Sequence, residues 1–590
     1  MMPTMPTRAL ALLLLAACTS GGSLSLSDKD DVEDDPDGPT GPPTTWYRDA
    51  DEDGFGVDDD TLEKVGAPPG YVAEGGDCDD GDPRISPRAE EACNGDDDNC
   101  DGETDEGFDK DGDGFRNEGC PSGDDCDDDD ASIHPGAADV CEDGADQDCD
   151  GADEACADPE GPVSLEDATA KLWSTERASD LGRHMDVGDI DGDGNADLLV
   201  GAMWASSYRG SAWVLPGPIG GSGPIADVAV KLTGSPGTYE GGRTTAIFDI
   251  NDDGYDDVLL GGPDSTSYDA VIFFGPITED APFDNADILT YCEGPVECGH
   301  GGDLADVDGD GIGDAVIAAG EGRTGGYESG SVYVRHGPLS AGTFDLQEEF
   351  DAEIIGSEAN MESGRVTAAG GDLNGDGVGD ILITATYDNE GAPGAGAVYV
   401  MYGPVSGAIK LGLEEDGKLT GAASYDYVGE GLTMGDVDGD GLSDVLAGAI
   451  AASRADGQAY MMRGPASGTQ SFADADLTLQ GVDTEGLGLS ITVGDYDADG
   501  TGDIFVGAYS NAAAGYGAGA AYLFLGAPTG TVTSEEASHI YFGEARGDAA
   551  GAGVGMGDLN SDGTLDLLVG AITESTGGAQ AGALYFLANP

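Results

Sequence analysis

The stretch Asp189-Ile-Asp191-Gly-Asp193-Gly-Asn195-Ala-Asp197, followed directly by Leu198-Leu-Val-Gly-Ala202, decides how this chain folds. Acidic side chains stand at positions 1, 3, 5 and 9, and the glycine at position 6 permits a sharp turn. Carboxylates spaced in this way can converge on one point, and oxygen ligands favour a hard cation, calcium before magnesium. The apolar run after the turn is short and typical of a buried strand. The sequence therefore predicts a metal-binding loop, here called an Asp loop, between two strands.

The Asp loop occurs seven times, and successive copies begin 60, 57, 66, 64, 59 and 63 residues apart. A motif that returns at a nearly constant spacing indicates a repeat architecture. The candidate metal ligands at positions 1, 3, 5 and 9 are Asp189, Asp191, Asp193 and Asp197; Asp249, Asn251, Asp253 and Asp257; Asp306, Asp308, Asp310 and Asp314; Asp372, Asn374, Asp376 and Asp380; Asp436, Asp438, Asp440 and Asp444; Asp495, Asp497, Asp499 and Asp503; and Asp558, Asn560, Asp562 and Asp566.

The charge of the chain excludes several classes of function. It has 118 acidic and 22 basic residues and a formal net charge of −96. Recognition of nucleic acid needs clustered Lys and Arg, and docking on anionic lipid needs a basic face, so we expect neither. The alternative of a disordered acidic chain is less favoured, because most acids lie in spaced loops between apolar strands. The 101 glycines fit a turn-rich β protein.

The N-terminus has the features of an export signal. Arg8 precedes the apolar run 9–17, which is too short to span a bilayer and is typical of a secretory signal. The sequence Leu15-Ala-Ala-Cys18 resembles the bacterial lipobox, which implies a signal at 1–18 and lipidation of Cys18. The alternative is ordinary cleavage nearby with an unmodified cysteine. We expect residues 19–45 to be a disordered linker that reaches roughly 30 Å, and the chain to be anchored at a bacterial cell surface or outer membrane through the lipid alone.

Two small cysteine-rich modules follow, at 46–107 and 108–158. Each opens with an acidic loop and continues with an Asp-Cys-Asp-Asp stretch, at 77–80 and 125–128. Neither has enough apolar residues for a core of its own, so each needs disulfides or metal to hold its shape. The candidate metal ligands in their opening loops are Asp49, Asp51 and Asp53, and Asp109, Asp111 and Asp113.

The order of these motifs resembles the MopE-type metal-binding repeat of bacterial surface proteins and, more loosely, the type 3 repeats of thrombospondins. The name of the MopE family implies copper in one member. We expect calcium here instead, because the modules offer carboxylates and lack a His/Met cluster.

Cysteine usage agrees with export. Apart from Cys18 there are ten cysteines, three in the first module, five in the second, and Cys292 with Cys298. An even number in an exported chain indicates disulfides. Cys93 with Cys100, and Cys141 with Cys149, lie close in sequence, but the odd number in each module also allows a bridge between modules, and the pairing stays open. Cys292 and Cys298 are spaced to close one local loop.

Residues 163–590 repeat one pattern. Each repeat has an inner strand, the Asp loop, an apolar strand, a variable loop and a strand that ends in Gly-Pro or a similar pair. Four short strands in each of seven repeats predict an all-β protein with a seven-bladed β-propeller after the two modules. Residues 170–173 precede the first Asp loop, so we expect them to supply the fourth strand of the last blade and close the ring.

This domain resembles the FG-GAP repeats of integrin α-subunit propellers, over about 428 of the 590 residues. The resemblance implies that each Asp loop joins the two innermost strands and binds calcium structurally, with about seven ions in the propeller and further ions expected in the N-terminal modules. It also implies that position 7 of each loop binds through its carbonyl oxygen, at Asn195, Tyr255, Ile312, Val378, Leu442, Thr501 and Thr564. Crowded carboxylates repel by roughly 1–4 kcal/mol per close pair, so we expect the propeller to be stable only with calcium.

The face opposite the Asp loops is the expected ligand face. Exposed aromatic residues and arginines in loops suit stacking on sugars or anchoring of a protein partner. The alternative is that they are ordinary loop residues. The candidates are Trp204, Tyr208, Arg209, Tyr268, Tyr327 and Tyr425.

No enzyme motif stands out. The five histidines fall in different units, and no HExxH pair, GxSxG elbow or phosphate loop occurs. The sequence therefore predicts a non-enzymatic, calcium-binding surface lipoprotein for adhesion to an extracellular protein or glycan. The alternatives are a polysaccharide-active enzyme that uses the propeller face and a purely structural envelope protein.

Overall fold

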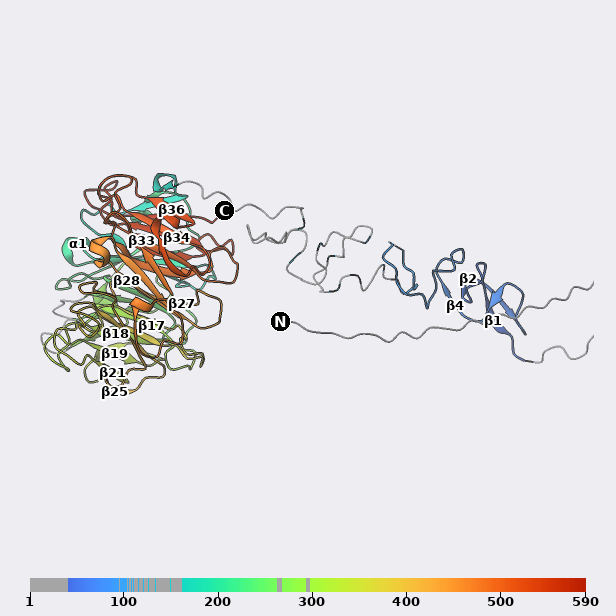
Figure 1. Ribbon diagram of the computed structural model, residues 1–590, viewed down its shortest axis with the longest axis horizontal. Coiled ribbons are helices and arrows are strands. Elements are labelled where there is room, and N and C mark those ends of the chain that lie inside the picture. The colour runs from blue at the N-terminus through green and yellow to red at the C-terminus, as the bar shows by residue number, and fades with distance from the viewer. Residues whose placement is uncertain are drawn as a thin grey trace, which may run out of the picture. The chain divides into compact units, whose positions relative to one another are not determined.

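The computed structural model describes residues 41–94, 96–102, scattered positions from 104 to 149, and residues 162–262, 268–292 and 298–589. The chain divides into two compact units, Met1–Ala157 and Asp158–Pro590, which are described separately (Figure 1). The predicted signal with Cys18, and the candidate ligands Asp109, Asp111 and Asp113, lie outside the described residues. No helix among the described residues is long and apolar enough to cross a membrane.

The N-terminal unit contains a small sheet in the order β3-β1-β2-β4. Its strands are β1 (Thr44–Arg48), β2 (Gly56–Lys64), β3 (Tyr71–Val72) and β4 (Gly75–Asp77). Described segments outside this sheet are joined by disulfides, as their shortage of apolar residues predicts.

Among the described residues of this unit, disulfides join Cys78 to Cys100, Cys93 to Cys120 and Cys126 to Cys149. Cys93 and Cys100, which are close in sequence, are therefore not bonded to each other. The bridge from Cys93 joins the two predicted modules, a possibility that their odd cysteine counts allowed. A further bridge, Cys292–Cys298, closes the expected local loop in the second unit.

The second unit contains seven sheets of five strands each, numbered here in chain order. Sheet 1 comprises β7 (Leu181–Gly188), β8 (Asp197–Ala202), β9 (Ser211–Leu215), β11 (Val230–Thr233) and β15 (Ala281–Pro282); sheet 2 β12 (Thr244–Phe248), β13 (Asp257–Gly261), β14 (Ala270–Phe273), β16 (Ile288–Tyr291) and β20 (Gly342–Asp345); sheet 3 β17 (Gly301–Ala305), β18 (Asp314–Ala319), β19 (Ser331–Arg335), β21 (Ala352–Ile355) and β25 (Gly407–Lys410); sheet 4 β22 (Thr367–Ala369), β23 (Ile381–Ala385), β24 (Ala397–Met401), β26 (Gly417–Thr420) and β30 (Gly468–Ser471).

Sheet 5 comprises β27 (Leu432–Gly435), β28 (Asp444–Ala449), β29 (Gln458–Met462), β31 (Leu477–Gln480) and β35 (Gly530–Thr533); sheet 6 β32 (Leu487–Gly494), β33 (Asp503–Ala508), β34 (Ala520–Phe524), β36 (His539–Phe542) and β5 (Val163–Ser164); sheet 7 β37 (Ala550–Gly557), β38 (Asp566–Ala571), β39 (Ala583–Leu587), β6 (Ala170–Trp173) and β10 (Gly223–Pro224). Short helices lie between strands: α1 (Ala205–Tyr208), α2 (Ala452–Ala455), and the 3-10 turns η1 (Leu165–Asp167), η2 (Ile225–Asp227), η3 (Phe283–Asn285), η4 (Phe472–Asp474) and η5 (Ser534–Glu536).

The predicted all-β class and repeat architecture are confirmed. The first strands of the sheets contact one another in the cyclic order β7, β12, β17, β22, β27, β32, β37 and back to β7, so they surround a common axis as in a β-propeller. The second strands are buried throughout, as in β8 and β28, because sheets pack on both of their faces. Hydrophobic clusters accordingly span neighbouring sheets.

The prediction of four strands per repeat was one strand short. Each sheet has a fifth, parallel strand, contributed by a connection of another repeat; β15, for example, pairs with β11. An exposed fourth strand would leave a row of unpaired N–H and C=O groups. The connection covers this edge as it passes, and its few polar residues carried no strand signal.

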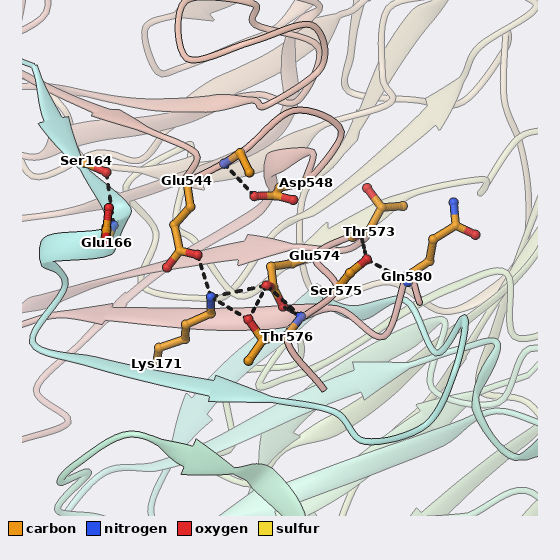
Figure 2. A network of polar contacts seen from close by, with 11 residues as sticks. Ser164, Glu166, Lys171, Glu544, Asp548, Thr573, Glu574, Ser575, Thr576 and Gln580 are labelled. Carbon is orange, nitrogen blue, oxygen red and sulfur yellow. Dashed lines mark hydrogen bonds and ion pairs between the residues drawn. The ribbon is translucent and has the colours of Figure 1, made fainter. Parts of the chain in front are cut away.

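The ring is closed as the sequence predicts. Strand β6 pairs antiparallel with β39, so residues near the start of the domain complete the sheet built from its end. Figure 2 shows how Lys171 of β6 fastens this junction. Its ammonium lies 2.7 Å from Glu544, 3.3 Å from Glu574 and 3.1 Å from the hydroxyl of Thr576. It also lies 5.1 Å from the centre of the Tyr585 ring.

We expect Lys171→Met to weaken the closure. The side chain of Glu574 is only 6% exposed, and removing Lys171 leaves this buried carboxylate with hydrogen bonds from Thr576 but without a counter-charge. Loss of one member of such a pair lowers the free energy of unfolding by about 2–4 kcal/mol. Urea unfolding of the full chain measures this, with the exposed Lys410→Met as the matched control. Equal unfolding midpoints for both variants and the parent would contradict this role for Lys171.

Candidate metal centres and the opposite face

Each Asp loop lies where the sequence predicts, between the first and second strands of its sheet. The loop at 189–197, for example, joins β7 to β8, and its ninth residue begins β8. All seven ninth-position aspartates are at most 1% exposed. The loops therefore stand at one end of the first strands, with their last carboxylate at the edge of the core.

The ninth aspartate fastens three segments together. In sheet 1, one carboxylate oxygen of Asp197 accepts from the N–H of Ile190 at 3.0 Å, and the other accepts from the N–H of Gly217 at 2.9 Å. Gly217 belongs to the Gly-Pro pair that ends the third strand. The same two bonds recur in all seven repeats, on Asp197, Asp257, Asp314, Asp380, Asp444, Asp503 and Asp566.

Burial has an electrostatic consequence for these carboxylates. It raises the pKa of Asp257 to about 7 and those of Asp380 and Asp444 to about 6, and neighbouring loop carboxylates raise them further. A cation in the loop would relieve this repulsion.

The other loop carboxylates are held by backbone donors. The two oxygens of Asp189 accept from the N–H groups of Gly192 and Gly194, at 2.8 and 3.0 Å. Asp189, Asp191 and Asp197 each offer an oxygen within 4.8 Å of the others. In the second loop, the side-chain oxygen of Asn251 is buried and has no hydrogen-bond partner among the described residues. Converging oxygens with an orphaned buried acceptor fit a hard divalent cation.

Neighbouring loops are also linked to each other. The carbonyl of Asp189 in the first loop accepts from the N–H of Asp256 in the second at 3.1 Å. The carbonyl of Asp249 in turn accepts from Gly313 in the third loop at 2.8 Å. The backbone of one loop is therefore fixed in part by the next.

Two loops differ from the others because they contact a basic side chain. His336 lies 3.4 Å from Asp308 in the third loop, and Arg463 lies 3.0 Å from Asp438 in the fifth. Both stand just before the glycine that ends the third strand, a position that carried no signal in the sequence analysis. A guanidinium on a ligand carboxylate competes with a metal ion for the same charge.

The first N-terminal module brings together more acids than predicted. Asp49, Asp51 and Asp53 form one group of oxygens, and Asp51 also lies in a second group with Asp77 and Asp80. One oxygen each of Asp51, Asp53 and Asp77 is buried without a hydrogen-bond partner among the described residues. Asp77 and Asp80 were not among the predicted ligands, although the Asp-Cys-Asp-Asp stretch that contains them recurs in both modules.

The candidate ligand residues fare differently. Trp204, Tyr208, Tyr327 and Tyr425 are 41–60% exposed, and Arg209 is also exposed. Tyr268 is only 4% exposed, and its hydroxyl lies 3.1 Å from that of Thr238 in the interior, so its prediction as a ligand residue was wrong. Its ring packs into the hydrophobic cluster between sheets 1 and 2. The sequence of a loop does not reveal such burial between two sheets.

The sequence analysis missed a ring of residues at the end of the first strands opposite the Asp loops. Each follows a glycine of positive φ. Asp189, the first residue of the first Asp loop, lies six positions after Arg183 along an extended strand, which is about 20 Å. All seven line a single cavity of about 420 Å³, to which Trp204 also contributes. In sheet order these rim residues are Arg183, Arg243, His300, Arg365, Glu430, Leu489 and Ala552. The recurring Gly-X pair was the available signal.

The rim is chemically uneven. Its basic residues come from sheets 1 to 4, and its apolar residues from sheets 6 and 7. Arg243 pairs with Glu240 at 2.8 Å, and Arg365 lies 3.2 Å from Glu362 and 3.5 Å from Glu430. Arg183 has no ion pair among the described residues.

Two partly buried acids, here called the channel acids, lie on first strands below the rim. Asp186 accepts from the N–H of Ile247 at 2.8 Å, and Asp303 accepts from the N–H of Ala369 at 2.8 Å. Each thus ties the first strands of neighbouring sheets together. Burial raises the pKa of both to about 7.

Comparison with known proteins supports the repeats. A family model described as the FG-GAP repeat matches residues 181–215, 363–401 and 550–587, and an FG-GAP-like repeat matches 436–506. A Cu-binding MopE model, described as "Putative metal-binding motif", matches 77–106 and 125–155. The resemblances to FG-GAP repeats and to MopE-type repeats predicted from the sequence are confirmed.

Similar proteins share only part of their length with this chain. Integrin alpha pat-2 of Caenorhabditis elegans is 26% identical over 274 residues, 46% of this chain and 18% of the relative. Phosphatidylinositol-glycan-specific phospholipase D of Mus musculus is 32% identical over 143 residues, 23% of this chain and 17% of the relative. The chain therefore matches less than a fifth of either relative.

Among solved structures, rhamnogalacturonan lyase YesW is 14% identical with a TM-score of 0.28, over 67% of this chain and 69% of that one. A TM-score this low supports no inference about function.

The basic contact in the fifth loop leads to a prediction about metal affinity. We expect Arg463→Leu, which introduces the residue type found at the same place in the sixth repeat, to strengthen divalent-cation binding, because Asp438 loses its competing guanidinium. Titration with calcium, followed by calorimetry, measures the number and affinity of sites. Lys410→Met is the control for loss of an unrelated cation. A titration curve unchanged from that of the parent would contradict the competition.

The channel acids lead to a prediction about pH. Asp186 keeps in the folded state a proton that the unfolded chain, with a pKa near 3.9, releases. This group therefore makes the free energy of unfolding fall as pH rises from about 4 to about 7. Asp186→Asn does not titrate, so the variant should lose less stability than the parent between pH 5 and pH 8. Urea midpoints at both pH values, at one calcium concentration, test this; identical pH dependence in both proteins would refute it.

Proposed function

Since the chain carries FG-GAP repeats and MopE-type metal-binding motifs, we propose that it is a calcium-binding, lipid-anchored surface protein that holds an extracellular ligand on the face opposite the Asp loops. The loops supply a constant scaffold, and the other ends of the same strands supply the recognition. The metal would be held by the carboxylates at positions 1, 3, 5 and 9 of each loop and by the carbonyl at position 7. Its role is to neutralise their repulsion and fix the turn.

One observation carries the placement of the ligand. The seven Asp loops repeat the same chemistry, whereas the seven rim positions do not, and together they line one cavity. Structural demands are equal in every repeat, so they do not account for a rim that is basic on one side and apolar on the other. A cavity with a few convergent polar groups and an apolar wall is the usual form of a binding site.

Calcium is proposed over other metals because the loops offer only oxygen ligands. Transition metals would favour imidazole or thiolate, and among the loop contacts described here only that of His336 involves an imidazole. Loops of this kind on extracellular proteins bind calcium weakly, with Kd on the order of 0.1–1 mM. Sites of this affinity would fill with calcium in the calcium-rich medium outside a cell.

A capture experiment tests this function. Beads coated with the full chain are mixed with intact bacterial cells in millimolar calcium and again with chelator, and the medium is analysed for released sugars. We expect capture in calcium, its loss with chelator, and weaker capture by Arg183→Ala. Arg84→Ala in the N-terminal unit is the matched control and should capture like the parent.

Three results would overturn the proposal. Equal capture of cells with and without calcium would mean that ligand binding does not depend on metal in the Asp loops. No capture by a folded sample would favour a purely structural envelope protein. Release of sugars without retention of cells would favour a polysaccharide-active enzyme.

A further inference from the structure

A second depression lies beside the rim, between the loops of sheets 4 and 5. It has a volume of about 480 Å³ and is walled by three tyrosines, Tyr387, Tyr425 and Tyr427. The ring centres of Tyr387 and Tyr427 are 5.6 Å apart, and those of Tyr425 and Tyr427 are 6.2 Å apart. Tyr425 is 60% exposed and Tyr387 39% exposed. These residues are here called the tyrosine cleft.

The fold does not require aromatic residues at these positions. Tyr427 stands three residues before the rim residue Glu430, and Tyr425 stands five before it. Both have positive φ, 67° for Tyr425 and 51° for Tyr427. In the other repeats described at this turn, small or polar residues occupy the same left-handed positions. The residues that stand three positions before a rim residue are Asp180, Glu240, Glu362, Gly486 and Ala549. Those that stand five positions before a rim residue are Ala178, Asn360, Thr484 and Gly547.

Bulky side chains in this conformation cost on the order of 1–3 kcal/mol each. Such a cost persists where the side chain serves a purpose, and the exposure of Tyr425 shows that its purpose is not packing in the core. Two strained aromatic residues in one turn, one of them well exposed, therefore point to a ligand.

The cleft is also held in shape before any ligand arrives. The N–H of Tyr425 donates to the carbonyl of Pro393 at 3.0 Å, and the N–H of Tyr427 donates to that of Gly394 at 3.2 Å. A methyl group on Gly394 would lie 3.1 and 3.3 Å from the two rings, which is tight, and the φ of 64° at this residue also favours glycine. A site that is preorganised loses less entropy on binding.

The polar groups around the rings define the kind of ligand. Asn360, Glu362 and Asn389 lie at the cleft, and the described residues that line it include no Lys, Arg or His. An anionic ligand would find no counter-charge there and would be repelled by a net charge of −96. Aromatic faces beside amide and carboxylate groups suit a flat molecule with C–H groups on its faces and hydroxyls at its edge.

We propose that the tyrosine cleft binds a neutral saccharide, with a sugar ring stacked on Tyr425 and Tyr387. This deepens the function proposed above and rests on it: the saccharide would be the part of the extracellular ligand that the face recognises. The ion pair of Glu362 with Arg365 joins the cleft to the rim, so one glycan chain can reach both.

Calorimetry on the full chain in millimolar calcium tests the proposal. The probes are maltohexaose, cellohexaose, xylohexaose and chitohexaose, with oligogalacturonate as the anionic probe and decaproline as the peptide probe. We expect at least one neutral oligosaccharide to bind, and Tyr425→Gly to weaken it about tenfold or more. Glycine adopts positive φ freely, so this variant keeps its fold. Tyr425→Phe should bind nearly as the parent does.

The matched control is Tyr516→Gly, which removes another exposed tyrosine, at 78% exposure, and should leave binding within about twofold of the parent. Binding of no neutral oligosaccharide, or equal binding by Tyr425→Gly, would overturn the proposal. Tyr425-dependent binding of decaproline alone would make the cleft a peptide site, which also overturns it. If cells are captured in calcium but these probes are not bound, the proposed function stands and the saccharide assignment fails. If neither cells nor probes are bound, both the proposed function and the saccharide assignment fail.

Discussion

The buried aspartate at the ninth position of each Asp loop is the interaction on which the rest of the repeat domain depends. Its two oxygens join the start of the loop, the second strand and the residue after the third strand in all seven repeats; that residue is a glycine in six repeats and Asn589 in the seventh. An unpaired buried carboxylate is costly, and two backbone donors offset only part of that cost. The same residue is a candidate metal ligand. The same side chain therefore stabilises the fold and is placed to bind a metal ion.

This arrangement explains why the sheets share one end and differ at the other. At the Asp-loop end, backbone bonds run from one loop to the next, as from Asp256 to the carbonyl of Asp189. Variation there would disturb neighbours on both sides. At the rim, each residue follows a glycine and faces a shared cavity. Substitution at the rim changes the lining of this cavity and leaves the sheet pairing intact.

The sequence allowed much of the fold to be predicted, and for physical reasons. The spacing of the Asp loops and the apolar strands after them set the repeat and the closure by residues 170–173, because both depend on local pattern. The fifth strand could not be predicted, since it forms by pairing with the exposed edge of the fourth strand of a neighbouring sheet and not from a pattern in its own sequence. Tyr268 looked like a surface residue because its loop is polar, yet packing between two sheets buries it.

The candidate sites were predictable in part. The acidic ligands were evident because carboxylates crowded at a fixed spacing repel one another, and a bound cation removes that repulsion. The basic contacts of His336 and Arg463 were not evident, because they reach the loops from the third strand. The rim was signalled only by a recurring Gly-X pair, whose convergence on one cavity is seen in space, and the tyrosine cleft emerges when equivalent positions of the repeats are compared in space. In each case the missing information was a contact between segments distant in sequence.

The central claim is that metal ions in the Asp loops hold the repeat domain together. The most direct measurement is the thermal unfolding of the full chain in millimolar calcium and after exhaustive chelation. The account predicts that chelation lowers Tm by more than about 10 °C and that added calcium restores it. A Tm that does not change with chelation would contradict the account.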